Sequence, residues 1–166
     1  MASFHTKTLS SHDDYMTPKS AWEAIADFLP KDKVLWEAFY GDGKSGDYLT
    51  DLGFQVIHGD FDFFEHDFGD VVVSNPPFSK TKEVLTRLKE LDKPFVLLMP
   101  CSKLQTSYIR TLFGSSNDPL QIILPRKRIQ FVKIVNGKPV QENKCNFDCF
   151  YYCYKMNLPR DIVFLP

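Results

Sequence analysis

The sequence has no long apolar run and lacks the marks of a secreted or membrane protein. No stretch approaches the roughly 20 consecutive apolar residues of a membrane-spanning helix, and the start, MASFHTKTLSSHDDY, has no apolar signal core. The four cysteines fit no disulfide framework, which points to a reducing compartment. We therefore expect an intracellular protein, cytoplasmic or nuclear, without membrane contact.

A strong charge of either sign is also missing. The net charge is −1, with 20 Lys and Arg against 21 Asp and Glu, whereas a domain that grips long nucleic acid electrostatically is usually basic. Any contact with nucleic acid should therefore be local. Repeats, linkers and low-complexity tracts are absent too, so the 166 residues predict a single domain, 1–166, whose polar residues 1–13 we expect to be flexible.

The cysteines give little sign of a metal site. Cys145, Cys149 and Cys153 are spaced by four, which on a helix would align them. Their aromatic neighbours favour a strand instead, with Phe147 and Tyr151 on the same face as Cys149 and Cys153. There is no paired C-x-x-C knuckle. We expect buried structural thiols and no metal.

Strand-like and helix-like segments alternate along the chain. We expect strands at 34–36, 54–58, 70–74, 95–99, 120–124 and 145–154, helices at 18–29, 45–52, 81–91 and 104–113, and a hairpin turn at Asn136-Gly137. This order predicts a small Rossmann-like α/β fold with a late antiparallel strand. Only residues 59–69 separate the second strand from the third, so the sheet should be reduced there.

The most informative segment is VVVSNPPFS at residues 71–79. Its adjacent valines predict a strand buried on both faces. Pro76 and Pro77 then end the strand, because they have a fixed φ and no N–H to donate. Asn75 is held extended by the proline that follows it. The result is a stiff loop at the carboxyl end of a central strand, where open α/β sheets bind ligands.

This loop presents groups that suit an amino group on a flat ring. The Asn75 side-chain oxygen and the Pro76 carbonyl can accept the two N–H bonds of such an amine and turn its lone pair toward an electrophile. Fixed carbonyl dipoles stabilise the positive charge that grows on the nitrogen, and Phe78 can stack on the ring. Because an amide is no strong base, we assign Asn75 to positioning and electrostatics.

Asn/Asp-Pro-Pro-Tyr/Phe after a hydrophobic strand resembles the catalytic motif of S-adenosylmethionine-dependent amino methyltransferases, which methylate adenine at its 6-amino group. The resemblance implies that Asn75, Pro76, Pro77 and Phe78 form the catalytic site and that S-adenosylmethionine is the cofactor. It also implies a Rossmann-like class I methyltransferase sheet with a late antiparallel hairpin, reduced between the second strand and the NPPF strand. The plain alternative is a proline-rich turn that ends a strand.

A glycine-rich turn, EAFYGDG at residues 37–43, follows the first strand and precedes a helix. Glycines there let the backbone approach a ligand and adopt positive φ, and the helix N-terminus offers N–H groups to a carboxylate. The turn is similar to the first cofactor motif of the family, although the usual proline at its second position is an alanine here. The similarity implies cofactor contacts for Glu37, Phe39, Tyr40, Gly41 and Gly43.

The segment that opens the first helix adds to the resemblance. Tyr15-Met-Thr17-Pro18 is similar to the Tyr-x-Thr-Pro element that precedes the cofactor strand in many adenine methyltransferases. The similarity places Tyr15, Thr17 and Pro18 against the cofactor. Taken by their residue types alone, Thr17 is a helix cap and Pro18 is the first helical residue.

The acidic segment GDFDFF follows the second strand. Family members place one acid there on the cofactor ribose and a second acid, often in an Asp-Phe-Phe context, at the cofactor adenine. We favour Asp60 for the ribose and Asp62 with Phe63 for the adenine, although the shortness of the segment leaves the two acids interchangeable. The alternative is a solvated acidic loop.

The basic residues Arg126, Lys127, Arg128 and Lys133 lie in or beside the late hairpin, with Phe131 between them. The segment LPRKRIQFVKIVNGKPV resembles a hairpin of phage-type DNA adenine methyltransferases. These side chains are our candidates for holding phosphates. An edge strand whose lysines prevent edge pairing is the competing interpretation.

Together these features predict a small enzyme, similar to phage or viral DNA adenine methyltransferases, that methylates adenine in nucleic acid. DNA is favoured over RNA, and the target base is expected to be flipped out. No separate recognition domain fits after the motif, so specificity is low or comes from the hairpin, a partner or a second subunit. The alternatives are an RNA adenine methyltransferase, a protein glutamine methyltransferase and a non-catalytic nucleic-acid-binding subunit.

Overall fold

The computed structural model describes residues 15–115, 117–136, 138–140 and 147–166. Its centre is a seven-stranded sheet in the order β10-β6-β9-β5-β4-β2-β3. The strands are β2 (Val34–Glu37), β3 (Gln55–His58), β4 (Val71–Ser74), β5 (Phe95–Pro100), β6 (Gln121–Leu124), β9 (Cys149–Tyr154) and β10 (Ile162–Phe164). Only β9 runs antiparallel to its neighbours, β5 and β6. The prediction of a mostly parallel α/β sheet with a late antiparallel strand is therefore confirmed.

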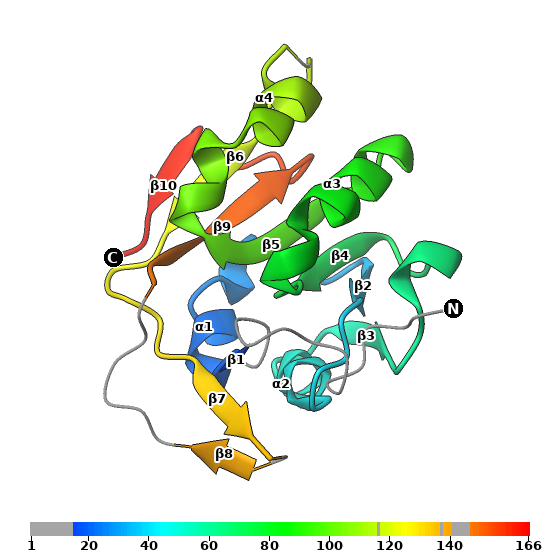
Figure 1. The fold of residues 1–166 in the computed structure, drawn as a ribbon, viewed down its shortest axis with the longest axis vertical. Helices are drawn as coiled ribbons and strands as arrows, with labels where there is room; N and C mark the ends of the chain where they lie inside the picture. The colour runs from blue at the N-terminus through cyan, green and yellow to red at the C-terminus, as the bar shows by residue number, and fades with distance from the viewer. Residues whose placement is uncertain (1–14, 116, 137, 141–146) are drawn as a thin grey trace.

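Helices cover both faces of this sheet (Figure 1). Apolar side chains of α1 (Lys19–Glu23) and α2 (Lys44–Asp51) pack on one face, and those of α3 (Thr81–Glu90) and α4 (Ser107–Phe113) pack on the other. The valines of β4 alternate between the two cores, since Val71 and Val73 join the first and Val72 joins the second. A strand covered on both sides needs no polar alternation, which explains its unbroken apolar sequence.

Strand β9 confirms the assignment of the cysteines to a buried face. Cys149, Tyr151 and Cys153 lie in the core on the α1 side, with Phe147 packed against it. Cys145 is outside the described residues. Within the described ranges, no group of three His, Cys, Asp or Glu side chains is arranged to hold a metal ion, and no helix is both long and apolar enough to cross a bilayer.

A second, three-stranded antiparallel sheet joins the start of the described chain to the late hairpin. It consists of β1 (Tyr15–Met16), β7 (Val132–Val135) and β8 (Lys138–Val140) in the order β1-β7-β8, with Tyr15 opposite Lys133. The hairpin projects beyond the main sheet (Figure 1). Asn136 begins its turn with a φ of 53°, a value that Asn tolerates. The hairpin is thus not an extension of the central sheet.

Pairing with β7 also corrects the predicted start of the first helix. Extended backbone runs from β1 through Pro18, whose ψ is 155°, so α1 begins at Lys19 and Thr17 makes no cap. The helix is short as well, because it passes into the 3-10 turn η2 (Ala26–Phe28). The consequence is that the Thr17 side chain is left to face the sheet edge instead of the helix.

The connection between β3 and β4 is reduced, as expected from its length. It contains only the 3-10 turn η3 (Phe63–Glu65), and β3 becomes the edge of the sheet. Two further 3-10 turns, η4 (Phe78–Lys80) and η5 (Cys101–Gln105), follow β4 and β5. The other edge is β10, a strand that the sequence analysis missed. The predicted flexibility of residues 1–13 lies outside the described part of the chain.

Candidate active site at the carboxyl edge of the sheet

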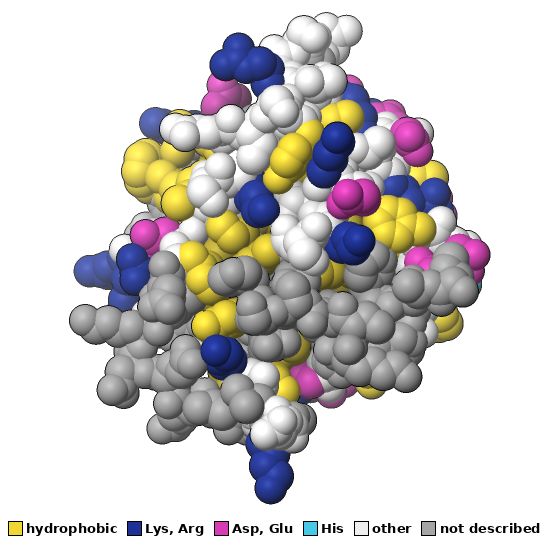
Figure 2. Space-filling view, viewed as in Figure 1, with side chains coloured by type: hydrophobic (Ala, Val, Ile, Leu, Met, Phe, Trp, Pro, Cys, Tyr) yellow, Lys and Arg dark blue, Asp and Glu magenta, His cyan; other side chains and the backbone are white. Residues whose placement is uncertain are grey.

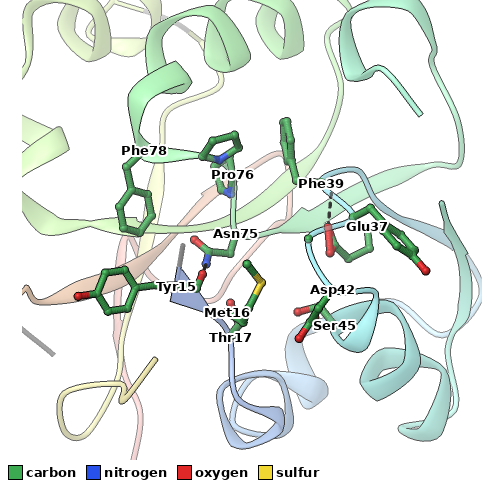
Figure 3. Close-up of a pocket in the computed structure, with 13 residues that line it drawn as sticks. Tyr15, Met16, Thr17, Glu37, Phe39, Asp42, Ser45, Asn75, Pro76 and Phe78 are labelled. Atoms are coloured by element: carbon green, nitrogen blue, oxygen red, sulfur yellow. Dashed lines mark hydrogen bonds between the residues drawn. The ribbon is translucent and has the colours of Figure 1, made fainter. Parts of the chain in front are cut away.

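A cleft opens at the carboxyl ends of β2 and β4, which pair in parallel. In the sheet, β3 lies on one side of β2 and β4 lies on the other side of β2. The cleft is therefore at a point where the strand order reverses. It contains about 520 Å³ of empty space, part of it open to solvent. The lining residues, most of them labelled in Figure 3, are Tyr15, Met16, Thr17, Glu37, Phe39, Tyr40, Gly41, Asp42, Ser45, Asn75, Pro76, Pro77 and Phe78.

The Asn75 amide lies in this cleft with its oxygen unused. Its Nδ2 donates to the backbone carbonyl of Tyr15 at 3.4 Å. Because a carbonyl can only accept, this contact fixes which end of the amide is the NH₂. The Asn75 Oδ1 is buried and receives no hydrogen bond from the described residues. A buried acceptor without a donor is unfavourable, so the cleft favours a ligand that brings an N–H to this oxygen.

The residues after Asn75 form a rigid turn. Pro76 and Pro77 are both buried, and Pro77 is extended, with φ −60° and ψ 126°. The Phe78 carbonyl accepts a hydrogen bond from the Lys103 Nζ at 3.2 Å. The Phe78 ring is half-buried at the rim, where it meets the Phe147 ring edge-on, with 5.3 Å between centroids. The turn therefore presents an aromatic face beside the amide.

Glu37 ends β2 and is almost completely buried. The Ser74 hydroxyl and the Phe39 backbone N–H, the latter at 3.0 Å, both donate to the same oxygen, Oε1. Burial raises the pKa of Glu37 to about 8, and the charge of Asp42 adds to this rise, while the two hydrogen bonds oppose it. Such a carboxyl is mostly protonated at neutral pH and ionises when a cationic group arrives beside it.

The turn after β2 requires glycine at two positions. Gly41 has a φ of 58°, and a Cβ there would lie 3.0 Å from the Met16 Sδ. Gly43, the residue before α2, has a φ of 80°, and a Cβ there would lie 2.7 Å from the Tyr40 hydroxyl. Positive φ and close neighbours both exclude larger residues. The Tyr40 ring thus lies over the glycine backbone.

Thr17 and Pro18, two neighbouring residues of the predicted cofactor site, lie in different places. Thr17 lines the cleft, and its buried Oγ1 receives or donates no hydrogen bond among the described residues. Pro18 follows it but is outside the cleft lining and borders a separate groove beside α1. Tyr15 and Thr17 therefore lie at the site. Pro18 is the extended residue that connects β1 to α1.

The acidic segment does not line the cleft, so its role at the cofactor stays a prediction. Phe63 is fully buried and stacks on Trp36 with 5.5 Å between centroids. The Asp62 Oδ1 accepts the Phe64 backbone N–H at 2.9 Å and caps η3, whereas its Oδ2 is buried without a partner among the described residues. Asp60 is exposed. The physical reason is the short connection, because η3 folds the segment directly back onto the core.

The four basic candidates are divided between two places. Arg126 and Lys127 border the groove beside α1 and do not line the cleft. Arg128 borders it too and is paired with Asp148 through bonds of 2.7 and 3.1 Å. Lys133 alone is near the cleft, with its Nζ 5.7 Å from the centre of the Tyr15 ring.

Five residues at the site were not predicted, and two of them, Asp42 and Ser45, line the cleft beside the glycine turn. Ser74 is fully buried and holds Glu37, and a hydroxyl directly between the valine run and Asn75 was a signal for it. Lys103 reaches the motif from η5, and Met16 packs on Gly41. Neither of these two had a local signal, because both depend on contacts between distant parts of the chain.

Comparison with known proteins adds no identification. No protein-family model matches the sequence, and no curated protein matches it significantly.

Proposed function

We propose that the protein transfers a methyl group from S-adenosylmethionine to the exocyclic amino group of adenine in nucleic acid, with DNA as the favoured substrate. The observation that carries this proposal is the buried, unsatisfied Asn75 Oδ1, which lies in a cleft at the carboxyl end of β4. An amine donor completes its hydrogen bonding, whereas a plain strand-ending turn has no use for such an acceptor.

The residues of the loop have separate tasks in this reaction. Asn75 Oδ1 and the Pro76 carbonyl accept the two N–H bonds of the amine, which orients its lone pair and stabilises the positive charge that develops on the nitrogen. Phe78 stacks on the base. When bound, S-adenosylmethionine supplies the methyl group, which leaves the sulfonium sulfur as the new C–N bond forms. The amine proton then passes to solvent.

Several features of the cleft fit that cofactor. The Thr17 Oγ1 is a second buried polar atom without a partner among the described residues. The Glu37 carboxyl, protonated when alone, suits the amino group of the methionine part. Gly41 and Gly43 keep the turn backbone open to a close approach. The Tyr40 ring, 37% exposed, lies over this turn and must turn aside to admit a ligand.

The sheet order supports the same proposal. The predicted class I methyltransferase plan ends in a strand inserted antiparallel to the rest, and β9 lies between β5 and β6 in this way. The shortened connection before β4 removes structure at the β3 edge only. The parallel neighbours β2 and β4, which carry Glu37 and Asn75, are complete.

The test is Asn75→Ala, with Asn117→Ala in an exposed loop as the matched control. We expect methyl transfer to fall by about 100-fold or more in Asn75→Ala, the cost typical of removing one electrostatic contact to a reacting group. Cofactor affinity, measured by calorimetry, should stay within about threefold of wild type. Unchanged turnover removes Asn75 from the mechanism, and wild-type protein that binds no S-adenosylmethionine refutes the proposed function.

A substrate panel decides the acceptor. Wild-type protein is incubated with labelled cofactor and single-stranded DNA, duplex DNA, RNA or protein, and methyl incorporation is followed. We expect incorporation into DNA at adenine. Incorporation into RNA or into protein glutamine alone would replace DNA as the substrate, and binding of the cofactor without any transfer would favour a non-catalytic subunit.

A further inference from the structure

The rim of the cleft is lined by aromatic side chains. Tyr15 and Phe78 each meet Phe147 edge-on, with 5.2 and 5.3 Å between ring centroids. Phe131 packs on Phe147 at 5.4 Å. The rings of Tyr15 and Phe78 lie on the same side of Asn75 in Figure 3. Because nucleobases stack on aromatic rings irrespective of sequence, this rim is suited to the bases of a single strand.

Two lysines reach the same rim from different elements. Lys103, from η5, places its Nζ 3.2 Å from the backbone oxygen of Phe78. Lys133, from β7, places its Nζ 5.7 Å from the Tyr15 ring centre. Both side chains are half-buried along their length, which restricts where their charged ends can lie. The aromatic rim therefore has one ammonium group at the Phe78 backbone carbonyl and one beside the Tyr15 ring.

The cluster at residues 126–128 lacks this relation to the cleft. The Arg128 guanidinium is already paired with the Asp148 carboxylate through two bonds. Arg126 and Lys127 border a groove formed with Pro18, Ala21 and the chain's last residues. Neither residue lines the cleft that contains Asn75.

We propose that Lys103 and Lys133 hold phosphates of a single nucleic-acid strand that crosses the aromatic rim, and that Arg126 and Lys127 do not contribute. This inference rests on the proposed function, because it places the base at Asn75. It agrees with the charge of the protein, since the net charge is −1 and Figure 2 shows Lys and Arg side chains separated by apolar and acidic ones. A few local phosphate contacts give a shallow salt dependence.

The test measures binding of a fluorescent, adenine-free oligothymidylate by anisotropy between about 50 and about 300 mM salt, where each phosphate contact on a single strand contributes about 0.7 to the slope of log K against log salt. The variant Lys103→Gln/Lys133→Gln should lower the slope by about 1.4, the sum of two such contacts. The matched control, Arg126→Gln/Lys127→Gln, should leave the slope unchanged. A charge-preserving variant, Lys103→Arg/Lys133→Arg, should retain it and shows that a lost slope is not misfolding.

Each other outcome overturns the inference. A slope lowered by the 126/127 variant alone moves the phosphate contacts to the groove beside α1. Absence of oligothymidylate binding, or stronger binding to duplex than to single strand, removes the single-strand surface. Calorimetry with S-adenosylmethionine on the same samples separates the two proposals. Wild-type protein that binds cofactor but shows no lysine dependence refutes only this surface, whereas protein that binds no cofactor refutes the proposed function.

Discussion

Replacing Glu37 by Gln should remove a pH-dependent loss of stability and, under the proposed function, abolish the cofactor contact. Glu37 is 3% exposed, and burial raises its pKa from 4.5 to about 8. Between these two values the folded protein holds a proton that the unfolded chain has released. Stability contributed by the protonated carboxyl is therefore complete below the unfolded pKa and is lost as the pH rises through the folded pKa.

The magnitude follows from the size of the shift. At about 1.4 kcal/mol per pH unit, a rise from 4.5 to about 8 sets a limit of about 5 kcal/mol. From about pH 5 to about pH 8, the free energy of unfolding should fall by about 3 to 4 kcal/mol through this one group. Gln has the same shape, can accept the bonds from Ser74 and the Phe39 N–H through its oxygen, and does not titrate.

The assay is urea unfolding of wild type and Glu37→Gln at several pH values across this range, with the m-value checked for constancy. The quantity to compare is the difference in unfolding free energy between the two proteins, because other titrating groups cancel in it. We expect this difference to change in favour of Glu37→Gln by about 3 to 4 kcal/mol as the pH rises. A difference that stays constant within about 1 kcal/mol would falsify the buried, protonated state of Glu37.

Two further substitutions test the framework around the site. Gly43→Ala should destabilise the protein by about 1 to 2 kcal/mol in urea unfolding, because its φ of 80° is strained for alanine. The same cost should remain in a Tyr40→Ala background, which removes the steric clash alone; an unaltered midpoint would contradict the backbone argument. Tyr151→Phe should lower the free energy of unfolding by about 1 to 3 kcal/mol. The buried Tyr151 hydroxyl donates to the Ala21 carbonyl at 2.6 Å, and the substitution leaves this carbonyl without that donor. Stability equal to wild type would show that this carbonyl finds another donor.

Elements whose pattern is local were predictable. The run Val71–Val73 predicted a doubly covered strand, and β4 is buried at every position. The strand predicted after Cys145 put Cys149, Tyr151 and Cys153 on one face, which the structure confirms, and Tyr152 and Tyr154 on the other face are buried as well. In each case the strand period decides which side chains share a face.

Elements that exist through pairing with distant segments were not predictable. The two residues of β1 have no period of their own and become a strand only opposite β7. This pairing also delays α1 by one residue, and so the helix cap predicted for Thr17 was wrong. The strand β10 depends in the same way on β6. Local propensity cannot anticipate contacts that are created by the fold.

The candidate site shows the same difference between residues with a local sequence signal and residues placed by distant contacts. Asn75, Pro76, Pro77, Phe78 and the glycine turn were predicted and line one cleft, because each follows directly from a strand end. The carboxyl ends of parallel neighbours must meet at one edge. Residues predicted on longer connections do not line this cleft: the segment 59–69 turns into the core at Phe63, and loop 125–130 borders the groove beside α1.

The short connection between β3 and β4 lies away from the strands that form the cleft. The cleft needs only β2 and β4, which flank the point where the strand order reverses, and these two strands pair directly. Shortening the connection after β3 removes structure from the outer edge of the sheet and leaves that point untouched. The hairpin β7–β8 then adds β1 and Lys133 beside the cleft. The Asn75 loop and the Lys133 side chain thus lie beside one cleft, as the proposed function requires.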